Sequence, residues 1–445
     1  MIELHRVACA RTGLVACLAI TVASFTGCNG DDEGDPYEAD TAAPVTIGSA
    51  APSNAVVQWS DVATATINGT GTATATPEEQ RPIYSADLAT VHLAIYDALM
   101  AITGTHLPYA SAVQPPQAGA SQEAAIAAAA YRVLSVLFPN RVTLYQASYD
   151  SAVAAVADGD AKTRGLAVGT AAANAVLNLR LNDGRSIVLA AYVPGTGPGQ
   201  FRGTNPVNLF GPYVRPFALH NAAQFRPAGP PALTSTAYEQ ALAETRSLGG
   251  ATSSTRTAAQ TDTARFHTDA PPRFWPRNMR PLANRQASLS EAARLMALLW
   301  VAQADATIAC FEAKYFYQAW RPTSAITLAD TDGNPNTAAD TTWTPVVPTP
   351  NHPEYPAGHT CAAGAVAEVV RVFHGTRQVS FAFDSQAAGV TGTHHEYGTT
   401  DAMAQELQDA RIWGGMHFRY ATADGVALGK AVAKWALTQR FQPRQ

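Results

Sequence analysis

Apolar residues recur at helical spacing over most of this chain, and no stretch alternates convincingly with a period of two. The pattern predicts helices over residues 85–102, 121–137, 141–157, 161–181, 237–248, 258–267, 289–320, 357–374, 401–413 and 422–440. Long loops rich in Pro and Gly separate them, notably 194–231 and 271–281. Because no repeat or low-complexity tract divides residues 54–445, we expect one all-α domain there.

Two of these helices begin with capping-box chemistry, in which a hydroxyl and a carboxylate satisfy free backbone donors reciprocally. The pairs are Thr236 with Glu239 and Ser288 with Glu291. The helix that starts at 289 is expected to be long and to end before Pro322, because proline has no N–H to donate.

The N-terminus has the pattern of a secretory signal over residues 1–28. Arg6 and Arg11 precede an apolar run, 14–25, that is too short to span a bilayer. The run ends in Ser-Phe-Thr-Gly-Cys28, which resembles a bacterial lipobox with Phe25 where Leu is usual, so Cys28 is the candidate lipidation site. We expect an exported protein, either a cell-envelope lipoprotein (periplasmic or outer-membrane attached) or a plain secreted one.

Charge is unevenly placed along the chain. Residues 31–40 hold six acids and no base, so residues 29–53 are interpreted as an acidic flexible spacer. Without Glu3 and these six, 28 of the 35 acids remain, against 28 of the 30 bases without Arg6 and Arg11. A neutral body, in a chain with only 15% charged residues overall, argues against nucleic-acid binding and disorder. Beyond the signal, no run of ~18 uncharged apolar residues occurs, so the lipid anchor is the expected membrane contact.

The first candidate motif is Lys314-x6-Arg321-Pro322. Seven residues are nearly two helical turns, so both cations are expected on one helix face. The surrounding aromatic residues are Phe311, Tyr315, Phe316, Tyr317 and Trp320. Two cations on an otherwise apolar face favour a partly dry anion site. Snorkelling, or an ion pair of a cation with Glu312, is the alternative.

The second motif is Pro356-Ala357-Gly358-His359, placed before an apolar helix. Free amides and the helix dipole favour an anion at such a start, and glycine lets that backbone approach it closely. His359 would lie in the first turn, within reach for proton transfer.

The third motif is Arg411-x5-His417. Six residues along a continuous helix would turn these side chains to different faces. Gly414-Gly415 between them is therefore predicted to break the helix and let Arg411 and His417 converge.

Taken in order, Lys-x6-Arg-Pro, Pro-x-Gly-His and Arg-x5-His resemble the three-part signature of the vanadium-dependent haloperoxidases and the type 2 phosphatidic-acid phosphatase superfamily. The gaps agree, with about 38 residues from Arg321 to His359 and 52 from His359 to Arg411. From about residue 80 onward, further stretches resemble the bacterial secreted members. They are Val91-His-Leu-Ala-Ile-Tyr-Asp-Ala, Arg215-Pro-Phe, Gln224-Phe-Arg-Pro and Ala264-Arg-Phe.

The resemblance implies a helical-bundle domain with its anion-site motifs within residues 311–420. Lys314, Arg321, Arg411 and the Gly358 amide would neutralise the oxygens of vanadate or phosphate. His417 would be the axial vanadium ligand of a peroxidase or the nucleophile of a phosphatase. His359 would be the acid–base group, and Lys314 would polarise bound peroxide.

A haloperoxidase acting on hydrogen peroxide, a halide and an organic acceptor is the first hypothesis, and an acid phosphatase that needs no vanadate is the second. A non-catalytic oxyanion-binding lipoprotein is the third. His352, where bromoperoxidases carry a second histidine, favours bromide or iodide, unless it is a solvent-exposed loop residue. Ala357 replaces the family's usual Ser and removes one hydroxyl from the site, unless Thr360 or water substitutes. Because dimers are common in the family that this sequence resembles, the resemblance also implies a homodimer.

Two weaker signals concern metals and thiols. His394-His395-Glu396 is interpreted as loop, because adjacent side chains do not converge and no nearby ligand completes a zinc set. Given the proposed site, Cys310 and Cys361 would come within bridging distance, with two buried free thiols as the alternative.

Overall fold

The computed structural model describes residues 40–47, 53–69, 76–81, 83–112 and 114–445. The predicted signal segment 1–28, Cys28 and most of the 29–53 spacer lie outside these residues. Residues 39–445 form one compact unit.

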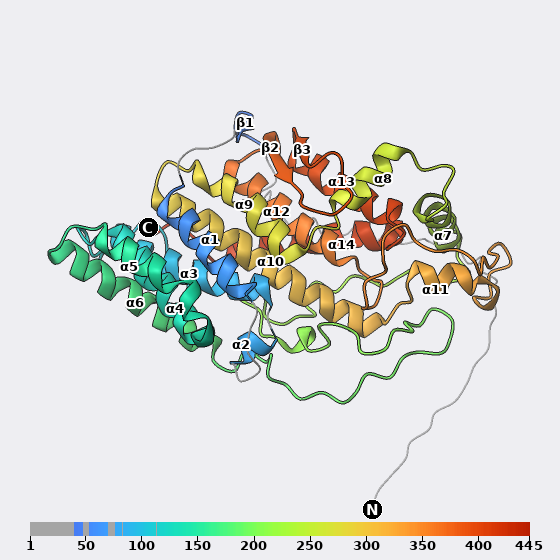
Figure 1. The fold of residues 1–445 in the computed structure, drawn as a ribbon, viewed down its shortest axis with the longest axis horizontal. Helices are drawn as coiled ribbons and strands as arrows, with labels where there is room; N and C mark the ends of the chain where they lie inside the picture. Colours follow the sequence, from blue (N-terminus) through green and yellow to red (C-terminus); the bar gives the residue numbers. More distant parts are fainter. Residues whose placement is uncertain (1–39, 48–52, 70–75, 82, 113) are drawn as a thin grey trace, which may run out of the picture. The chain divides into compact units, whose positions relative to one another are not determined.

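Helices dominate the described chain, as predicted (Figure 1). They are α1 (Ala55–Ile67), α2 (Pro77–Gln80), α3 (Tyr84–Thr103), α4 (Gln122–Leu137), α5 (Gln146–Ala154), α6 (Asp160–Arg180), α7 (Thr236–Gly249), α8 (Ala258–Phe266), α9 (Pro271–Asn284), α10 (Leu289–Tyr317), α11 (Pro322–Thr327), α12 (Gly358–His374), α13 (Thr400–Trp413) and α14 (Arg419–Gln439). Short 3-10 turns cover Pro139–Leu144, Gly211–Tyr213 and Ala329–Thr331. The predicted helix 141–157 is thus divided at Tyr145.

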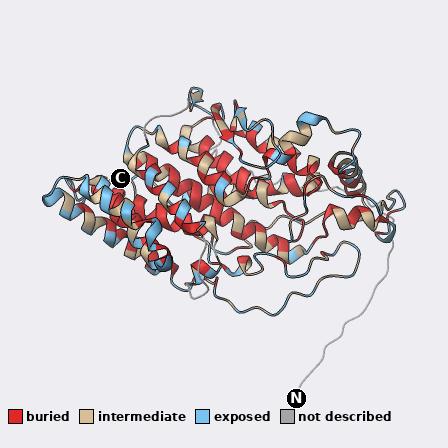
Figure 2. Ribbon diagram, in the orientation of Figure 1, coloured by how far each residue is buried: buried red, intermediate tan, exposed pale blue. Residues whose placement is uncertain are grey.

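The long helix α10 is the centre of the bundle and is buried nearly all round (Figure 2). It packs against α3 on one side and against α12 and α14 on the other. Helix α14 approaches α12 closely because Gly425 and Gly429 face the α12 backbone, where a Cβ atom would collide with Ala357 or Ala365. This crossing brings the start of α12 beside the start of α14.

Helices α3 and α10 are long and apolar enough to cross a membrane, but 89% of the most apolar window of each is buried inside the protein. Their buried acids hold loops instead. Asp305 of α10 accepts the amides of Phe217, Ala218 and Leu219 at 2.6, 2.7 and 3.0 Å. Asp97 of α3 likewise accepts amides of residues 109–111. Each carboxylate satisfies backbone donors that would otherwise be buried without partners.

The predicted loop 271–281 is wrong, because α9 covers it. Pro271 and Pro272 occupy the first turn, where no N–H is needed. Pro276 has no N–H to donate to the Pro272 carbonyl. The side-chain amide of Asn68 donates to this carbonyl instead, at 2.8 Å. Burial of apolar residues such as Trp275 and Met279 stabilises a helix that proline content argued against.

A small sheet also departs from the all-helical expectation. Strand β2 (Val379–Asp384) pairs antiparallel with β3 (His394–Tyr397) and parallel with β1 (Val45–Thr46). Its residues alternate between buried and partly exposed, a period of two that the sequence reading missed in so short a run. The described residues 40–47 of the predicted flexible spacer therefore lie against the domain.

The capping predictions were correct only for the hydroxyl of Ser288, because the Glu291 carboxylate accepts from Arg294 and does not complete the box. Ser288 caps α10 by accepting the Glu291 amide at 3.2 Å. In α7, however, the cap is Ser235, which accepts the Tyr238 amide at 3.2 Å, so the predicted Thr236 box is displaced by one residue.

Candidate functional site

The first motif does not lie on one helix. Helix α10 ends at Tyr317, where Gln318 adopts a left-handed conformation with φ of 49°. Arg321 is then the N-cap of the separate helix α11, and Pro322 starts that helix instead of ending α10. Lys314 and Arg321 are nevertheless both buried. The turn at 318–321, and not a shared helix face, brings the two cations together.

Lys314 donates to three backbone carbonyls of the loop before α12. Its Nζ lies 2.9 Å from Pro353 O, 3.0 Å from Glu354 O and 2.5 Å from Pro356 O. Burial and nearby Arg321 lower the pKa of Lys314 well below its usual value, whereas three carbonyl acceptors match the three N–H bonds of the ammonium form. The alternative pairing with Glu312 is wrong, because Glu312 accepts Arg226 Nε at 2.9 Å.

The second motif starts a helix as predicted. Ala357 is the N-cap of α12 and provides no side-chain cap, so the amides of Gly358 and His359 begin the helix without one. A Cβ atom at position 358 would lie 3.7 Å from Lys314 Cε, which places this amide beside Lys314. The helix start and the lysine therefore face the same space.

The third motif turns as predicted. Helix α13 ends at Trp413 and α14 begins at Arg419. Gly415 has φ of 73°, and a Cβ atom there would collide with the Gly249 backbone, so only glycine fits this turn. Arg411 and His417 are both buried on the inner side of it.

Arg321 and His417 meet at hydrogen-bond distance. Arg321 donates through one NH group to Met416 O at 2.9 Å, and the same group lies 3.1 Å from His417 Nε2. His417 Nδ1 lies 3.0 Å from Glu354 Oε1, a carboxylate oxygen that also accepts the Phe418 amide at 3.0 Å. Because Nδ1–H donates to Glu354, Nε2 of His417 keeps its lone pair towards Arg321.

Glu354 is the site residue that sequence reasoning did not assign. It is fully buried, and burial raises its pKa to about 7. The local sequence signal for this role was a glutamate placed between Pro353 and Pro356. Because its partner His417 lies 63 residues further along the chain, the sequence did not connect the two.

Arg411 donates to His267 O at 2.7 Å and approaches Met416 Sδ at 3.9 Å, but its Nε is buried with no hydrogen-bond partner. Burial, then Arg321, lower its pKa to about 9, so the guanidinium stays charged at neutral pH. A buried, charged donor without an acceptor is costly for a protein to keep. The Nε of Arg411 is therefore suited to donate to an oxyanion bound in this site.

We call Lys314, Arg321, Arg411 and His417, together with the Gly358 amide, the cationic cage. Within the described chain its three cations have carbonyl, sulfur or imidazole partners and no salt bridge. Burial and Arg321 lower the pKa of His417 well below 6.5, so this ring is neutral. The cage thus has an excess of buried positive charge that a tetrahedral oxyanion would compensate.

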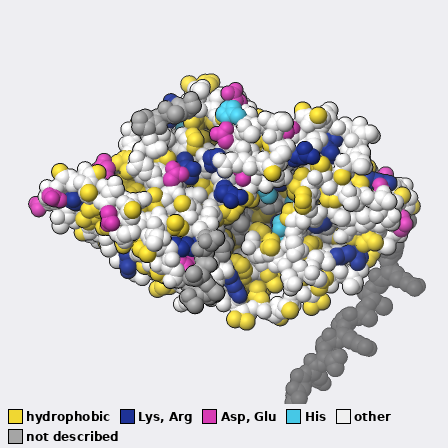
Figure 3. Space-filling view, in the orientation of Figure 1, with side chains coloured by type: hydrophobic (Ala, Val, Ile, Leu, Met, Phe, Trp, Pro, Cys, Tyr) yellow, Lys and Arg dark blue, Asp and Glu magenta, His cyan; other side chains and the backbone are white. Residues whose placement is uncertain are grey.

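The cage opens at Gly358, His359 and His352, which are half-buried while the rest is buried. Burial, then Arg411, lower the pKa of His359 well below 6.5. The face drawn in Figure 3 is hollowed near its middle, with histidine and basic side chains visible around the hollow. A neutral His359 at an open side can accept a proton from a bound molecule.

Two predicted modulators are placed by their contacts. His352 is not a free loop residue, because Arg321 donates to it at 2.9 Å and its ring lies 5.4 Å from that of Phe311. Thr360 donates its hydroxyl to Ala357 O at 3.0 Å and is fully buried towards Gly425 of α14. It therefore does not replace the hydroxyl that Ala357 lacks.

Cys310 of α10 and Cys361 of α12 form a disulfide, with Cα atoms 6.4 Å apart. The bond links two of the elements that carry the cage. It joins the turn before Lys314 to the turn after His359.

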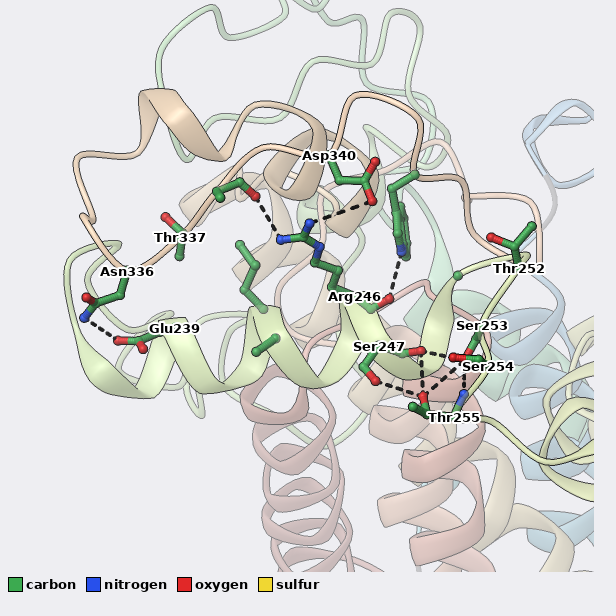
Figure 4. A pocket seen from close by; sticks show the side chains of 15 residues that line it. Glu239, Arg246, Ser247, Thr252, Ser253, Ser254, Thr255, Asn336, Thr337 and Asp340 are labelled. Atoms are coloured by element: carbon green, nitrogen blue, oxygen red, sulfur yellow. Dashed lines mark hydrogen bonds and ion pairs between the residues drawn. The ribbon is translucent and has the colours of Figure 1, made fainter.

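A surface pocket of about 430 Å³ lies elsewhere, between α7 and the loop around Asn336 (Figure 4). None of its lining residues belongs to the cage. Its polar groups pair with each other, as Asn336 does with Glu239 at 3.0 Å and Arg246 with Asp340 at 3.9 Å. We assign it no function.

Comparison with solved structures defines the class of fold. A bacterial vanadium-dependent iodoperoxidase superposes with a TM-score of 0.69, at 20% identity, over 89% of this chain and 100% of its own. A bacterial vanadium-dependent chloroperoxidase in its apo form gives a TM-score of 0.65, at 16% identity, over 80% and 92%. The fold is that of the vanadium haloperoxidases.

Sequence comparison agrees with the fold. Residues 294–443 match the VCPO second helical-bundle domain and so include the whole cage. Vanadium chloroperoxidase of Curvularia inaequalis is 29% identical over 253 residues, in a match that covers 44% of this chain and 41% of that protein. The match thus spans about two fifths of this relative's length. The predicted resemblance to the vanadium-dependent haloperoxidases is confirmed.

Proposed function

We propose that this protein is a vanadium-dependent haloperoxidase that oxidises a halide with hydrogen peroxide. The observation that carries the proposal is the cationic cage, in which buried cations that form no salt bridge within the described chain lie beside a neutral histidine nitrogen. A phosphate-shaped oxyanion matches this arrangement in charge, and vanadate is such an anion.

Vanadate would be held by Lys314, Arg321, Arg411 and the Gly358 amide, with Nε2 of His417 as the ligand that this chain offers to vanadium. When bound, vanadate supplies activation of hydrogen peroxide towards attack by a halide. Lys314 adds positive charge next to the amide at the start of α12, where charge on peroxide oxygen would be stabilised.

The protonation states of the two histidines suit different tasks. His417 is fixed through Nδ1 by Glu354, which keeps Nε2 unprotonated and aimed at the cage. His359 lies at the open side, and no hydrogen bond holds its ring within the described chain. It is therefore free to take a proton from incoming peroxide and return it to the product.

Bromide or iodide is the proposed halide, and an organic molecule in solution the final acceptor. The contact of His352 with Arg321 supports this choice, because it places a third imidazole at the open rim of the cage. A rim imidazole offers a weak hydrogen bond to a large, easily desolvated anion.

The direct test is turnover after vanadate loading. The purified chain is incubated with vanadate, supplied with peroxide and chloride, bromide or iodide in turn, and halogenation of a phenolic dye is followed. We expect bromide and iodide turnover that disappears in His417→Ala and persists in His394→Ala, an exposed histidine outside the cage. Vanadate binding without turnover for any halide would contradict the proposal.

An acid phosphatase remains the second candidate, because a neutral His417 Nε2 within a cationic cage also suits attack on phosphorus. Hydrolysis of a phosphomonoester without vanadate, abolished by His417→Ala, would favour it. Tight oxyanion binding with neither activity would favour the non-catalytic lipoprotein.

We further propose export with a lipid anchor at Cys28, and a homodimer as the working assembly. Metabolic labelling with palmitate and membrane fractionation should detect the anchor, and Cys28→Ser should abolish both signals. Sedimentation of the mature protein tests the dimer.

A further inference from the structure

A second polar cluster lies beyond the cage and uses none of its side chains. His267 follows α8, His395 lies in β3 and Glu406 lies in α13. His267 Nε2 and His395 Nδ1 each lie 2.8 Å from the same carboxylate oxygen, Oε1 of Glu406. One ligand atom from each residue therefore falls within 4.8 Å of the other two.

The surroundings fix these three side chains. The His395 ring stacks on Phe266 with ring centroids 3.9 Å apart. The Tyr397 hydroxyl donates to the same oxygen of Glu406 at 2.6 Å. His267 is almost completely buried, with 1% of its side chain exposed, whereas His395 and Glu406 are 17% and 26% exposed. The cluster is thus rigid on its inner side and open to solvent on its outer side.

The donor set is that of a metal site. Without an ion, both imidazoles and the phenol must all donate protons to one oxygen atom. His267 makes no other side-chain hydrogen bond, and its Nδ1 is buried without a partner. Two imidazole nitrogens and one carboxylate are the ligands of open, mononuclear zinc sites. Imidazole also disfavours Mg²⁺ and Ca²⁺, which take oxygen ligands.

We propose that His267, His395 and Glu406 bind a divalent transition-metal ion, for which Zn²⁺ is the best match. Small shifts would turn the two 2.8 Å contacts into ligand bonds around a shared ion, with solvent or the Tyr397 phenol in the remaining position. The ion would be bound between α8, β3 and α13. This assignment is independent of the activity proposed for the cage.

The site also has a structural link to the cage. The carbonyl oxygen of His267 accepts the Arg411 guanidinium at 2.7 Å. Fixing His267 by a metal ion would therefore fix one support of the cage cation.

Zinc titration of the untagged full chain tests the proposal. The protein is freed of metal with a chelator and titrated with ZnCl₂ by calorimetry in vanadate-free buffer. We expect one Zn²⁺ per chain, and at least a tenfold weaker affinity in both His395→Ala and Glu406→Gln. His394→Ala is the matched control, because His394 is the adjacent, half-exposed histidine and pairs with Asp384 instead.

Two outcomes would overturn the site: no stoichiometric zinc uptake by the wild-type chain, or unchanged affinity in both ligand variants. Circular dichroism shows whether the variants fold. If they do not, X-ray absorption on zinc-loaded wild-type protein decides, since two imidazoles are expected in the first shell at about 2.0–2.1 Å. A shell with fewer than two imidazoles would reject the assignment.

Discussion

Two buried clusters of charged side chains differ in whether their cations have carboxylate partners. The balanced cluster consists of Asp87, Arg180, Asp183 and Arg185, all with less than a tenth of their surface exposed. Arg185 donates to Asp87 at 2.7 Å and to Asp183 at 3.0 Å, and Arg180 donates to Asp183 at 3.2 Å. Both cations of this cluster have carboxylate partners, and Arg185 also lies 3.6 Å from the carboxylate of Glu78 at its edge. Among the described residues, the cationic cage instead has three cations and one nearby carboxylate, Glu354, which accepts from His417 and a backbone amide.

This difference separates a structural network from a binding site. Buried charges that compensate each other contribute to folding, and removing one partner leaves the other uncompensated. Buried charges that have no opposite charge beside them are retained at a cost to stability, which function explains.

A substitution in the cationic cage should reduce activity more than it reduces stability. We expect His417→Ala to lower the proposed halide-oxidising turnover by a factor on the order of 10³ or more, because the side chain proposed to hold vanadate is lost. Its melting temperature should stay within a few degrees of wild type. Steady-state assays with vanadate and thermal melts measure both, and a large loss of stability with normal turnover would contradict the comparison.

The balanced cluster should behave in the opposite way. Arg185→Met should lower the free energy of unfolding by about 3–5 kcal/mol, because Asp87 and Asp183 lose their buried partner. Arg411→Met, the matched change in the cage, removes a charge that has no carboxylate partner and leaves only the His267 carbonyl without its donor, so this free energy should fall by less, about 1–3 kcal/mol. Urea unfolding of both variants, without added oxyanion, measures the two free-energy changes. Equal losses would contradict the distinction between the balanced cluster and the cationic cage.

Glu354 makes the stability of the cage depend on pH. Its pKa rises from 4.5 to about 7 on folding, so the native state holds this proton more tightly than the unfolded chain. The contribution of this group to stability therefore falls as pH rises from about 4.5 to about 7, by up to roughly 3 kcal/mol. The difference in unfolding free energy between wild type and Glu354→Gln, measured across this window, should show that slope.

Oxyanion binding should stabilise the protein through the cage. At a concentration of vanadate or phosphate one hundred times its Kd, the free energy of unfolding should rise by about 2.7 kcal/mol. The gain should vanish in Arg411→Met and persist in Arg185→Met. Chloride at equal ionic strength is the control, since general screening would act on both variants alike.

The smallest expected effect concerns Ala357. A serine there would restore one hydroxyl to the start of α12, since Thr360 donates its own hydroxyl to the Ala357 carbonyl. One hydrogen bond to a charged oxygen contributes about 1.5–3 kcal/mol, so Ala357→Ser should tighten oxyanion binding tenfold or more. Calorimetric titration with vanadate measures this, and unchanged affinity would mean that the position is already compensated.

Local chain chemistry made much of the fold predictable. The helices at 85–102, 237–248 and 357–374 fell within one or two residues of the observed bounds, because apolar spacing and end residues mark them. Helix α9 was missed because proline content argues against a helix, while burial of its apolar face and the Asn68 side chain compensate. Strand β2 was missed because six residues are too few for a firm period.

The candidate site likewise has parts that the local sequence predicts and parts that it does not. The turn at Gly414–Gly415 and the helix start at Gly358 were predictable, since each depends on a few adjacent residues. The route from Lys314 to Arg321 was predicted wrongly, because a single left-handed residue, Gln318, changed the direction of the chain.

By itself, the sequence determined the bundle class, the order of the three motifs and the residue types that can hold an oxyanion. The tertiary structure alone decided which groups are left without partners. Arg411 Nε is unpaired, Glu354 orients His417, and His267, His395 and Glu406 meet although up to 139 residues separate them. The physical reason is that pairing depends on burial and contact in space, whereas helix and turn formation depend on neighbours along the chain.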